Sequence, residues 1–317
     1  MNETPTLSIL VPLYNEAESL PHLKEEIDKV LDREKIDTEI IFVDDGSQDG
    51  SSEIIQKFSQ DDPRVRTFHF RRNRGKSAAL DVGFKVARGT YVVTMDADLQ
   101  DDPNEIPSLI AKLEEGYDLV SGWKKRRHDP PSKTIPSRFF NFTARLTSGI
   151  NIHDFNCGLK IYRREVLDTI ELYGELHRFI PVLAHSQGWR VGEIEVLHHA
   201  RKWGKTKYGI SRMLYGALDL LTVLFITRFA IRPMHLFGAF GLISLLVGFI
   251  ILVWLSVQWF MGVPIGNRPL FFLGILAMIL GMQFFSIGLL GELITNMRMQ
   301  RNRELGPDVV DSTQRRS

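Results

Sequence analysis

Two long stretches without a charged residue constrain this chain more than any other feature of its sequence. From Leu236 to Phe260, and again from Pro269 to Gly291, there is no Asp, Glu, Lys or Arg. Each stretch is longer than the roughly 20 apolar residues that a helix needs to cross the hydrocarbon core of a bilayer. Buried core helices are the alternative, but they seldom run this far without a polar face. The sequence therefore predicts a hairpin of two transmembrane helices.

Basic residues flank the outer ends of the two stretches, whereas the short segment between them holds only Arg268. The flanking residues are Arg228, Arg232, Arg298, Arg301 and Arg303. By the positive-inside rule, both termini and the soluble part of the chain are expected in the cytoplasm, on an inner or plasma membrane. No signal peptide is expected, because Met1 to Thr6 is polar and the apolar run from Leu7 to Leu13 is too short.

Two segments are strongly basic. Residues 200–234 hold seven basic residues and one acidic residue, and residues 123–138 hold six and one. A basic region joined to a membrane span indicates contact with anionic headgroups or with an anionic lipid substrate. A solvated charged face is the alternative for Lys124 to Arg127. The polar residues of 210–231 recur every three or four positions, which predicts an amphipathic interfacial helix, with a third, shallow span as the alternative.

Short apolar runs of strand character alternate with helical patterns through the first half of the chain. The expected strands are 7–13, 39–43, 65–70, 91–95 and 118–122, and the expected helices are 17–31, 50–59, 77–87 and 104–115. Alternation at this spacing predicts βαβ units and a mostly parallel sheet. Because ligands of such sheets bind at the carboxyl ends of the strands, unusual polar residues should gather there.

Polar residues do follow three of the expected strands: 12–16 follow the first, 44–47 the second and 96–101 the fourth. A carboxylate of Asp44 or Asp45 can accept hydrogen bonds from a nucleobase or a ribose, while an Asx turn is the structural alternative. Asp96 and Asp98 flank a single residue, so both can approach one hard cation through oxygen ligands. These three strand ends therefore define a candidate site.

The same residues belong to an ordered set of motifs. In chain order the set is Val11-Pro12-x-Tyr14-Asn15-Glu16, Val43-Asp44-Asp45-Gly46-Ser47, Arg72-Asn73-x-Gly75-Lys76, Asp96-x-Asp98-Leu99-Gln100-Asp101-x-Pro103, Asp154-x-Asn156-Cys157-Gly158-x-Lys160 and Arg201-x-x-Gly204-x-Thr206-Lys207. The set resembles glycosyltransferase family 2, and within it the branch that glycosylates polyisoprenyl phosphates, such as bactoprenol glucosyltransferases and dolichol-phosphate mannose synthases. The resemblance covers roughly residues 7–295. A Gln-x-x-Arg-Trp motif is absent, which argues against the processive polysaccharide synthases of the family.

The resemblance implies a Rossmann-like GT-A domain with a mostly parallel sheet, followed by interfacial helices and the transmembrane hairpin. It implies an inverting, metal-dependent hexosyltransferase. The residues implied to bind the nucleotide sugar are Pro12, Tyr14, Asn15, Glu16, Asp44, Asp45, Lys76, Asp96, Ala97, Arg201 and Lys207. Asp96, Asp98 and Gln100 are implied to hold a divalent cation, Mg²⁺ or Mn²⁺, that neutralises the leaving pyrophosphate.

The implied acceptor is a membrane polyprenyl phosphate. A phosphate monoester has its second pKa near about 6, so it is mostly dianionic at neutral pH and a general base is optional. Asp98 and Asp154 are the catalytic candidates, and Asp154 serves as a base, an orienting group or a structural residue. Arg138 and Lys124 are expected to hold the lipid phosphate, and Cys157 is interpreted as a packing residue.

Several alternatives remain open at the level of sequence. Two spans match the layout of bactoprenol glucosyltransferases, which favours UDP-glucose as the donor. The product would then be a polyprenyl-phosphate sugar that serves cell-envelope glycans or protein glycosylation. GDP-mannose and a UDP-amino sugar are the alternative donors. A non-catalytic, membrane-tethered module that binds nucleotide sugars is the alternative from another class of protein. A homo-oligomer is a further expectation.

The expected domains are a catalytic domain over 1–200, a basic loop and interfacial helix over 201–234, two transmembrane helices over 235–296 and a disordered basic tail over 297–317. The net charge of +1 lacks the basic excess typical of proteins that bind nucleic acids. The single Cys excludes an internal disulfide framework.

Overall fold

The structure is a computed structural model that describes residues 5–125, 141–145, 148–199, 222, 223, 225, 233–265 and 268–304. Its internal contacts divide the chain into two units, Met1–Val223 and Leu224–Ser317, and each is described by itself. Nearly all of the expected interfacial helix, together with Arg138, Arg201 and Lys207, lies outside the described residues. The domain boundaries predicted from the sequence stay predictions.

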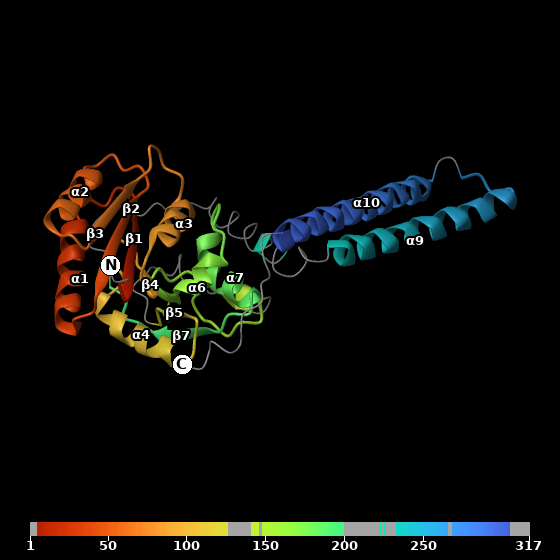
Figure 1. Ribbon diagram of the computed structural model, residues 1–317. Coiled ribbons are helices and arrows are strands. Elements are labelled where there is room, and N and C mark those ends of the chain that lie inside the picture. Colours follow the sequence, from red (N-terminus) through yellow and green to blue (C-terminus); the bar gives the residue numbers. More distant parts are fainter. Residues whose placement is uncertain are drawn as a thin grey trace. The chain divides into compact units, whose positions relative to one another are not determined.

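The described part of the first unit is built on a seven-stranded sheet with the order β3-β2-β1-β4-β6-β5-β7 (Figure 1). The strands are β1 (Leu7–Leu13), β2 (Thr38–Asp44), β3 (Val65–His69), β4 (Tyr91–Thr94), β5 (Leu119–Trp123), β6 (Lys160–Arg163) and β7 (Val191–Glu195). β1 pairs in parallel with β2 and β4, β2 pairs in parallel with β3, and β5 pairs in parallel with β7. β6 alone among them runs antiparallel to both of its neighbours. The predicted mostly parallel sheet is confirmed.

Polar and apolar residues do not alternate along the central strands, because both faces of these strands are buried. All seven residues of β1 and all seven of β2 are buried. Within β1, Ile9 and Val11 belong to one hydrophobic cluster, while Leu10 belongs to a second cluster on the other side of the sheet. Mostly apolar strands that are buried on both faces are typical of parallel sheets covered by helices on both sides.

Helices cover both faces of the sheet (Figure 1). One face carries α1 (Leu20–Glu34), α2 (Ser51–Asp61) and α4 (Ile106–Glu114), and the other carries α3 (Lys76–Val86), α6 (Arg164–Asp168) and α7 (Ile180–Ser186). Two 3-10 turns, η1 (Pro103–Glu105) and η2 (Leu176–Phe179), introduce α4 and α7. In α1 the buried residues Leu20, Leu23, Ile27 and Leu31 recur every three or four positions, so they form one apolar stripe against the sheet.

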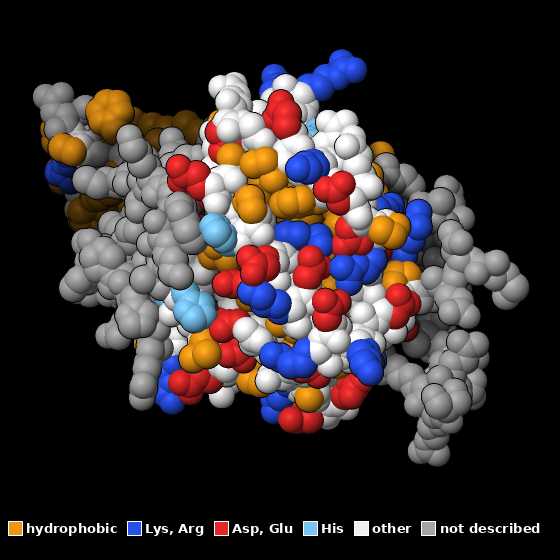
Figure 2. All heavy atoms as spheres, turned by 90° about the vertical axis from the view of Figure 1, so that its left-hand side faces the viewer, with side chains coloured by type: hydrophobic (Ala, Val, Ile, Leu, Met, Phe, Trp, Pro, Cys, Tyr) orange, Lys and Arg blue, Asp and Glu red, His pale blue; other side chains and the backbone are white. Residues whose placement is uncertain are grey.

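The surface over α1 and α2 carries interspersed acidic and basic side chains (Figure 2). Lys24 Nζ lies 2.9 Å from Asp62 Oδ2, and Arg64 Nη2 lies 2.9 Å from Asp28 Oδ1 and 2.8 Å from Asp62 Oδ2. Hydrogen bonds from Arg64 lower the pKa of Asp62 despite the partial burial of that carboxylate. These ion pairs tie α1 to the connection between α2 and β3.

The second unit contains α9 (Pro233–Phe260) and α10 (Pro269–Glu304), both long and apolar enough to cross a membrane by length and composition. Glycines let the two helices approach closely. A Cβ on Gly241 would lie 2.9 Å from the carbonyl oxygen of Gly281, and a Cβ on Gly248 would lie 2.8 Å from that of Gly274. Small residues at such contacts are typical of helix pairs in membranes. α10 continues to Glu304 and so includes the start of the expected tail.

The structure differs from the sequence pattern in two respects. The pattern does not predict β6, β7, α6 or α7, and β6 and α6 span only four and five residues, too few for a periodic signal. The helix expected over 17–31 begins later, at Leu20, where a Pro occupies the first turn. Proline is favoured there because the first turn of a helix needs no N–H donor.

Candidate functional site

The carboxyl ends of β1, β2 and β4 meet at one edge of the sheet, because these strands are parallel and in register. Asn15 joins the first two ends. Its N–H donates to Ser47 Oγ at 2.9 Å, and its Oδ1 accepts from the Gln48 N–H at 2.8 Å. Asn15 has a left-handed backbone with φ of 55°, a conformation in which Asn is enriched among non-Gly residues. Pro12, Tyr14, Asn15 and Glu16 therefore lie beside the end of β2, as the motif predicts.

Asp44 and Asp45 are both buried at the end of β2. Asp44 Oδ1 accepts from Ser47 N–H at 2.9 Å and from Ser47 Oγ at 2.5 Å, which forms the Asx turn considered above. Burial opposes ionisation of Asp44, but the hydrogen bonds from Ser47 and Ser52 outweigh it and lower its pKa. Asp45 accepts from the N–H groups of Arg74 and Gly75 at 2.6 and 2.8 Å, while burial raises its pKa. Both carboxylates thus hold loops at this edge.

Two aspartates and two lysines form paired charges at the end of β4. Lys76 Nζ is hydrogen-bonded to Asp96 Oδ1, and Lys124 Nζ lies 2.7 Å from Asp101 Oδ1. Asp101 Oδ2 also accepts from the Asp96 N–H at 3.2 Å. A Cβ on Gly158 would lie 2.7 Å from Asp96 Oδ2 and 2.8 Å from Asp101 Oδ2, so this glycine packs directly against both carboxylates.

These pairs determine the charge states of their members. Burial opposes ionisation of Asp96, but the Lys76 ammonium outweighs it and holds the pKa of that carboxyl below its usual range. Burial likewise opposes the charge on Lys124, but Asp101 outweighs it and raises the lysine pKa. Asp96 and Lys124 are therefore ionised at neutral pH, and each lies beside a side chain of the other kind, a lysine or an aspartate.

The turn that carries Asp98 and Gln100 is held by a neighbouring segment. Leu99 has a left-handed φ of 57°, and the Gln100 N–H donates to Asp98 Oδ1 at 3.2 Å. The His199 N–H donates to the Gln100 carbonyl at 3.0 Å, and His199 Nε2 lies 3.0 Å from Asp102 Oδ2. His199 is the last described residue before the basic motif that begins at 201.

Asp154 is buried in the loop before β6. Its Oδ1 accepts from the Asn156 N–H at 3.1 Å, and its own N–H donates to Glu193 Oε1 at 3.1 Å. Glu193 Oε1 accepts from the His153 N–H, and Glu193 Oε2 lies 2.7 Å from His153 Nδ1. The ring of His153 stacks on Trp123 with 4.3 Å between centroids. A single carboxylate on β7 therefore fixes the backbone that carries Asp154.

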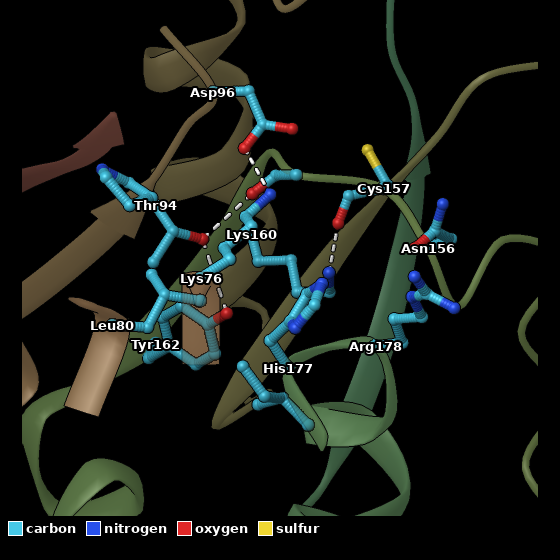
Figure 3. A pocket seen from close by; sticks show the side chains of 13 residues that line it. Lys76, Leu80, Thr94, Asp96, Asn156, Cys157, Lys160, Tyr162, His177 and Arg178 are labelled. Atoms are coloured by element: carbon cyan, nitrogen blue, oxygen red, sulfur yellow. Dashed lines mark hydrogen bonds and ion pairs between the residues drawn. The ribbon is translucent and has the colours of Figure 1, made fainter. Parts of the chain in front are cut away.

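A pocket lies beside the Asp96–Lys76 pair and is drawn in Figure 3. Its polar lining consists of Lys76, Thr94, Asp96, Asn156, Cys157, Lys160, Tyr162, His177 and Arg178, and Pro12, Gly158, Leu80 and Ile180 complete it. Lys160 Nζ donates to the Cys157 carbonyl. Thr94 Oγ1 donates to the Gly158 carbonyl at 2.9 Å and lies 3.3 Å from the Tyr162 hydroxyl.

Burial shifts the pKa of four titratable groups that line this pocket, and one of them is the Tyr162 hydroxyl, whose pKa it raises. It holds the pKa of His177 well below 6.5, so the ring is neutral, and His177 Nδ1 lies 3.0 Å from Ser77 Oγ. It raises the pKa of the Cys157 thiol to about 12 and lowers that of Lys160. A thiol protonated at neutral pH agrees with the packing role expected for Cys157.

The structure brings together most of the described residues that the sequence singles out. Asp96, Ala97, Asp98, Gln100 and Lys76 share one edge with the ends of β1 and β2. Lys124 is turned toward Asp101 and its side chain is 13% exposed, so its expected contact with a lipid phosphate stays a prediction. The sequence assigns no role to Thr94, Tyr162, His177 or Arg178, which have no motif signal and join the pocket only through the fold.

Comparison with known proteins agrees with the resemblance that the sequence motifs indicate. The model of glycosyl transferase family 2 matches residues 8–171. A dodecaprenyl-phosphate galacturonate synthase of Rhizobium johnstonii is 39% identical over 294 residues, which cover 91% of this chain and 87% of the relative. An undecaprenyl-phosphate 4-deoxy-4-formamido-L-arabinose transferase of Proteus mirabilis is 36% identical over 291 residues, 91% of this chain and 88% of the relative. Shares of this size extend beyond the first unit into the apolar helices.

Solved structures resemble the fold at low sequence identity. Glucosyl-3-phosphoglycerate synthase of Mycobacterium tuberculosis, in complex with Mn²⁺ and UDP-glucose, matches with a TM-score of 0.54 and 18% identity over 70% of this chain and 79% of that one. Mannosyl-3-phosphoglycerate synthase of Rubrobacter xylanophilus matches with a TM-score of 0.55 and 17% identity, over 68% and 73%. These likenesses concern the fold, and with the sheet order they confirm the predicted GT-A architecture.

Proposed function

Because the chain belongs to glycosyltransferase family 2, we propose that it transfers a sugar from a nucleoside diphosphate to a polyprenyl phosphate at a membrane. One observation carries this proposal. Two relatives that act on polyprenyl phosphates by name align with 91% of the chain, a share that includes apolar helices as well as the sheet. The strand-end edge supports the donor half of the reaction, and two helices able to cross a membrane support a lipid acceptor.

The proposed donor site lies across the ends of β1, β2 and β4. The loops at Asn15 and Asp45 are fixed by hydrogen bonds before any ligand arrives, which lowers the ordering cost of binding. Arg201 and Lys207, outside the described residues, are proposed to reach the pyrophosphate because Lys and Arg are the usual phosphate partners. Lys76, already at Asp96, is proposed to contact the same oxygens.

The residues present fit a hard divalent cation. Asp96 and Asp98 supply carboxylate oxygens and Gln100 an amide oxygen, the ligand type that Mg²⁺ and Mn²⁺ prefer. Among the described residues no group of three or more His, Cys, Asp or Glu could hold a metal ion, so phosphate oxygens of the donor would complete the coordination. Asp96 now binds a cationic group, the Lys76 ammonium, and its side chain is 34% exposed. A cation bound there supplies charge neutralisation to the departing pyrophosphate.

The proposed reaction is a single inverting displacement. An oxygen of the acceptor phosphate forms a bond to the anomeric carbon while the bond from that carbon to the nucleoside diphosphate breaks. The phosphate is mostly dianionic at neutral pH, so no proton has to be removed. Asp154 is proposed to orient the site through the loop that Glu193 fixes, and Arg138 to bind the acceptor phosphate.

The sugar and the topology are finer parts of the proposal. The two-helix layout favours UDP-glucose, whereas the two relatives are named for galacturonate and for 4-deoxy-4-formamido-L-arabinose. All three donors therefore belong in the test, with GDP-mannose beside them. We propose that both termini and the catalytic unit face the cytoplasm, on the grounds of the flanking arginines. The homo-oligomer stays a prediction.

The test is donor turnover by the purified full-length protein in detergent or nanodiscs. Each donor is offered with undecaprenyl phosphate and Mg²⁺ or Mn²⁺, and glycolipid is separated from unreacted donor. The Asp98→Asn variant keeps the size of the side chain and removes its charge, so turnover should fall by at least about a hundredfold, as losses of one electrostatic stabiliser do. Lys85→Met, a change of an exposed lysine on α3, is the control and should keep full turnover.

The outcomes distinguish a transferase from a non-catalytic binding module. Formation of a polyprenyl-phosphate sugar that depends on Asp98 and on the divalent cation supports the transferase and identifies its sugar. Binding of a nucleotide sugar without turnover on any polyprenyl phosphate would favour the non-catalytic binding module instead. Turnover that Asp98→Asn leaves unchanged would remove that residue from the proposed metal site.

A further inference from the structure

Lys160 is a buried cation that forms no ion pair with any residue that the structure describes. It is the first residue of β6 and is 3% exposed. Its Nζ donates to the carbonyl oxygen of Cys157, a neutral acceptor. Among the residues that the structure describes, no carboxylate lies within ion-pair distance of this ammonium. The two neighbouring lysines differ, since Lys76 is paired with Asp96 and Lys124 with Asp101.

Such an arrangement needs an explanation. An ammonium taken out of water loses far more solvation than one neutral hydrogen bond returns, so buried charges in proteins are normally paired. The carboxylates of Asp154 and Asp96 act on Lys160 through space, but burial outweighs them and lowers the pKa of the lysine. His177 is held neutral by burial, and Arg178 is 2.7 Å from its own partner, Glu175 Oε2. Within the described residues the charge of Lys160 is therefore balanced only in part, and an anionic ligand group would balance the rest.

The position of Lys160 points to the sugar of the donor. The pocket shares Lys76, Asp96 and Pro12 with the donor edge at the ends of β1 and β4, and Figure 3 shows Lys160 among the side chains that line it. A group bound there lies next to the proposed metal ligand Asp96, where the sugar of a metal-bound nucleotide sugar must be. A single ammonium matches the single charge of a carboxylate.

We infer that Lys160 binds the carboxylate of a uronic acid donor, so that this chain selects a nucleoside-diphosphate hexuronic acid over the corresponding neutral hexose. This inference rests on the proposed function and specifies its substrate class. The likeness to a galacturonate synthase supports the same class of sugar independently of the geometry. A phosphate of the acceptor lipid is the competing source of negative charge, and the test separates the two.

The experiment uses two pairs of donors that differ only in the carboxylate, UDP-galacturonate with UDP-galactose and UDP-glucuronate with UDP-glucose. Turnover on undecaprenyl phosphate is measured with the full-length wild type, Lys160→Met and Lys160→Arg. Lys160→Met removes the charge and keeps an apolar stem, while Lys160→Arg keeps the charge. Lys85→Met serves as the matched control, because it removes an exposed lysine on α3.

The expected result is a preference of the wild type for a uronate over its hexose in kcat/KM. Removing one partner of a buried charge pair commonly costs enough to lower a rate by roughly 30-fold or more. Lys160→Met should therefore reduce that preference by this factor, mainly through the uronate, while Lys160→Arg retains part of it and Lys85→Met all of it. Calorimetry should show the same loss in the affinity for UDP-galacturonate and no change in the affinity for UDP.

Three results would overturn the inference. The first is equal turnover of both members of each pair by the wild type. The second is an equal loss with uronate and hexose in Lys160→Met, and the third is a raised KM for undecaprenyl phosphate with an unchanged donor preference. Absence of turnover with every donor would instead contradict the proposed function. Because Lys160→Met removes a buried charge that forms no ion pair and keeps an apolar stem, the variant should fold, and UDP affinity verifies that it has.

Discussion

Gly158→Ala tests whether the two paired carboxylates at the end of β4 must keep their positions. The added Cβ would lie 2.7 Å from both Cγ and Oδ2 of Asp96 and 2.8 Å from Oδ2 of Asp101. Neither carboxylate can move freely, because Lys76 holds one and Lys124 the other. Overpacking of this kind costs about 1–3 kcal/mol of stability. A shift of about 1 Å in Asp96 is expected to lower kcat by about a hundredfold, as small misplacements of catalytic groups do.

The assay compares Tm, the kcat/KM for the preferred donor and the affinity for UDP with and without divalent cation. Tm should fall by roughly 2–4 °C for each kcal/mol lost. Gly83→Ala is the matched control, since its Cβ would lie 2.2 Å from Leu10 Cδ1 in the core and touches neither carboxylate. It should lower Tm and leave the cation-dependent part of UDP binding unchanged. A Gly158→Ala protein with wild-type turnover and wild-type cation dependence would refute the reasoning.

Three further predictions concern other parts of the chain. Because burial holds the pKa of His177 well below 6.5, the unfolded chain binds a proton below that pH that the native chain does not, so stability should fall between pH 7 and 5, by up to about 1.4 kcal/mol per pH unit. In urea unfolding at pH 7 and pH 5, His177→Gln should show a smaller difference in the free energy of unfolding between the two pH values than the wild type. An unchanged difference would contradict the assignment of this pH dependence to His177. The thiol of Cys157 is protonated and buried, so Cys157→Ala should keep kcat within about threefold. The lost packing should lower the free energy of unfolding by about 1 kcal/mol, which a lower Tm would report. A loss of turnover would show that the thiol has a chemical role. Met261→Cys, at a side chain that is 76% exposed, should react with a membrane-impermeant maleimide from outside intact cells, whereas labelling only after lysis would reverse the proposed topology.

The sheet edge could be predicted because its signals are local. β1 and β2 are mostly apolar runs, and the polar residues of the site follow each run directly in the sequence. Parallel pairing then brings those ends together without further information. β6 could not be predicted in this way. It spans four residues, and its place between β4 and β5 depends on antiparallel pairings with strands far away along the chain.

Lys124 shows why charge patterns alone misplace a side chain. It begins a run of four basic residues, and such a run is typical of an exposed face. In the folded chain it follows β5 directly, where Asp101 from the end of β4 lies 2.7 Å away and outweighs the cost of burying the ammonium. The partner comes from another strand, so no local pattern reveals it. The same logic applies in reverse to Lys160. Only the fold shows that it is buried with no carboxylate of the described residues at ion-pair distance, and it therefore indicates a ligand rather than a surface.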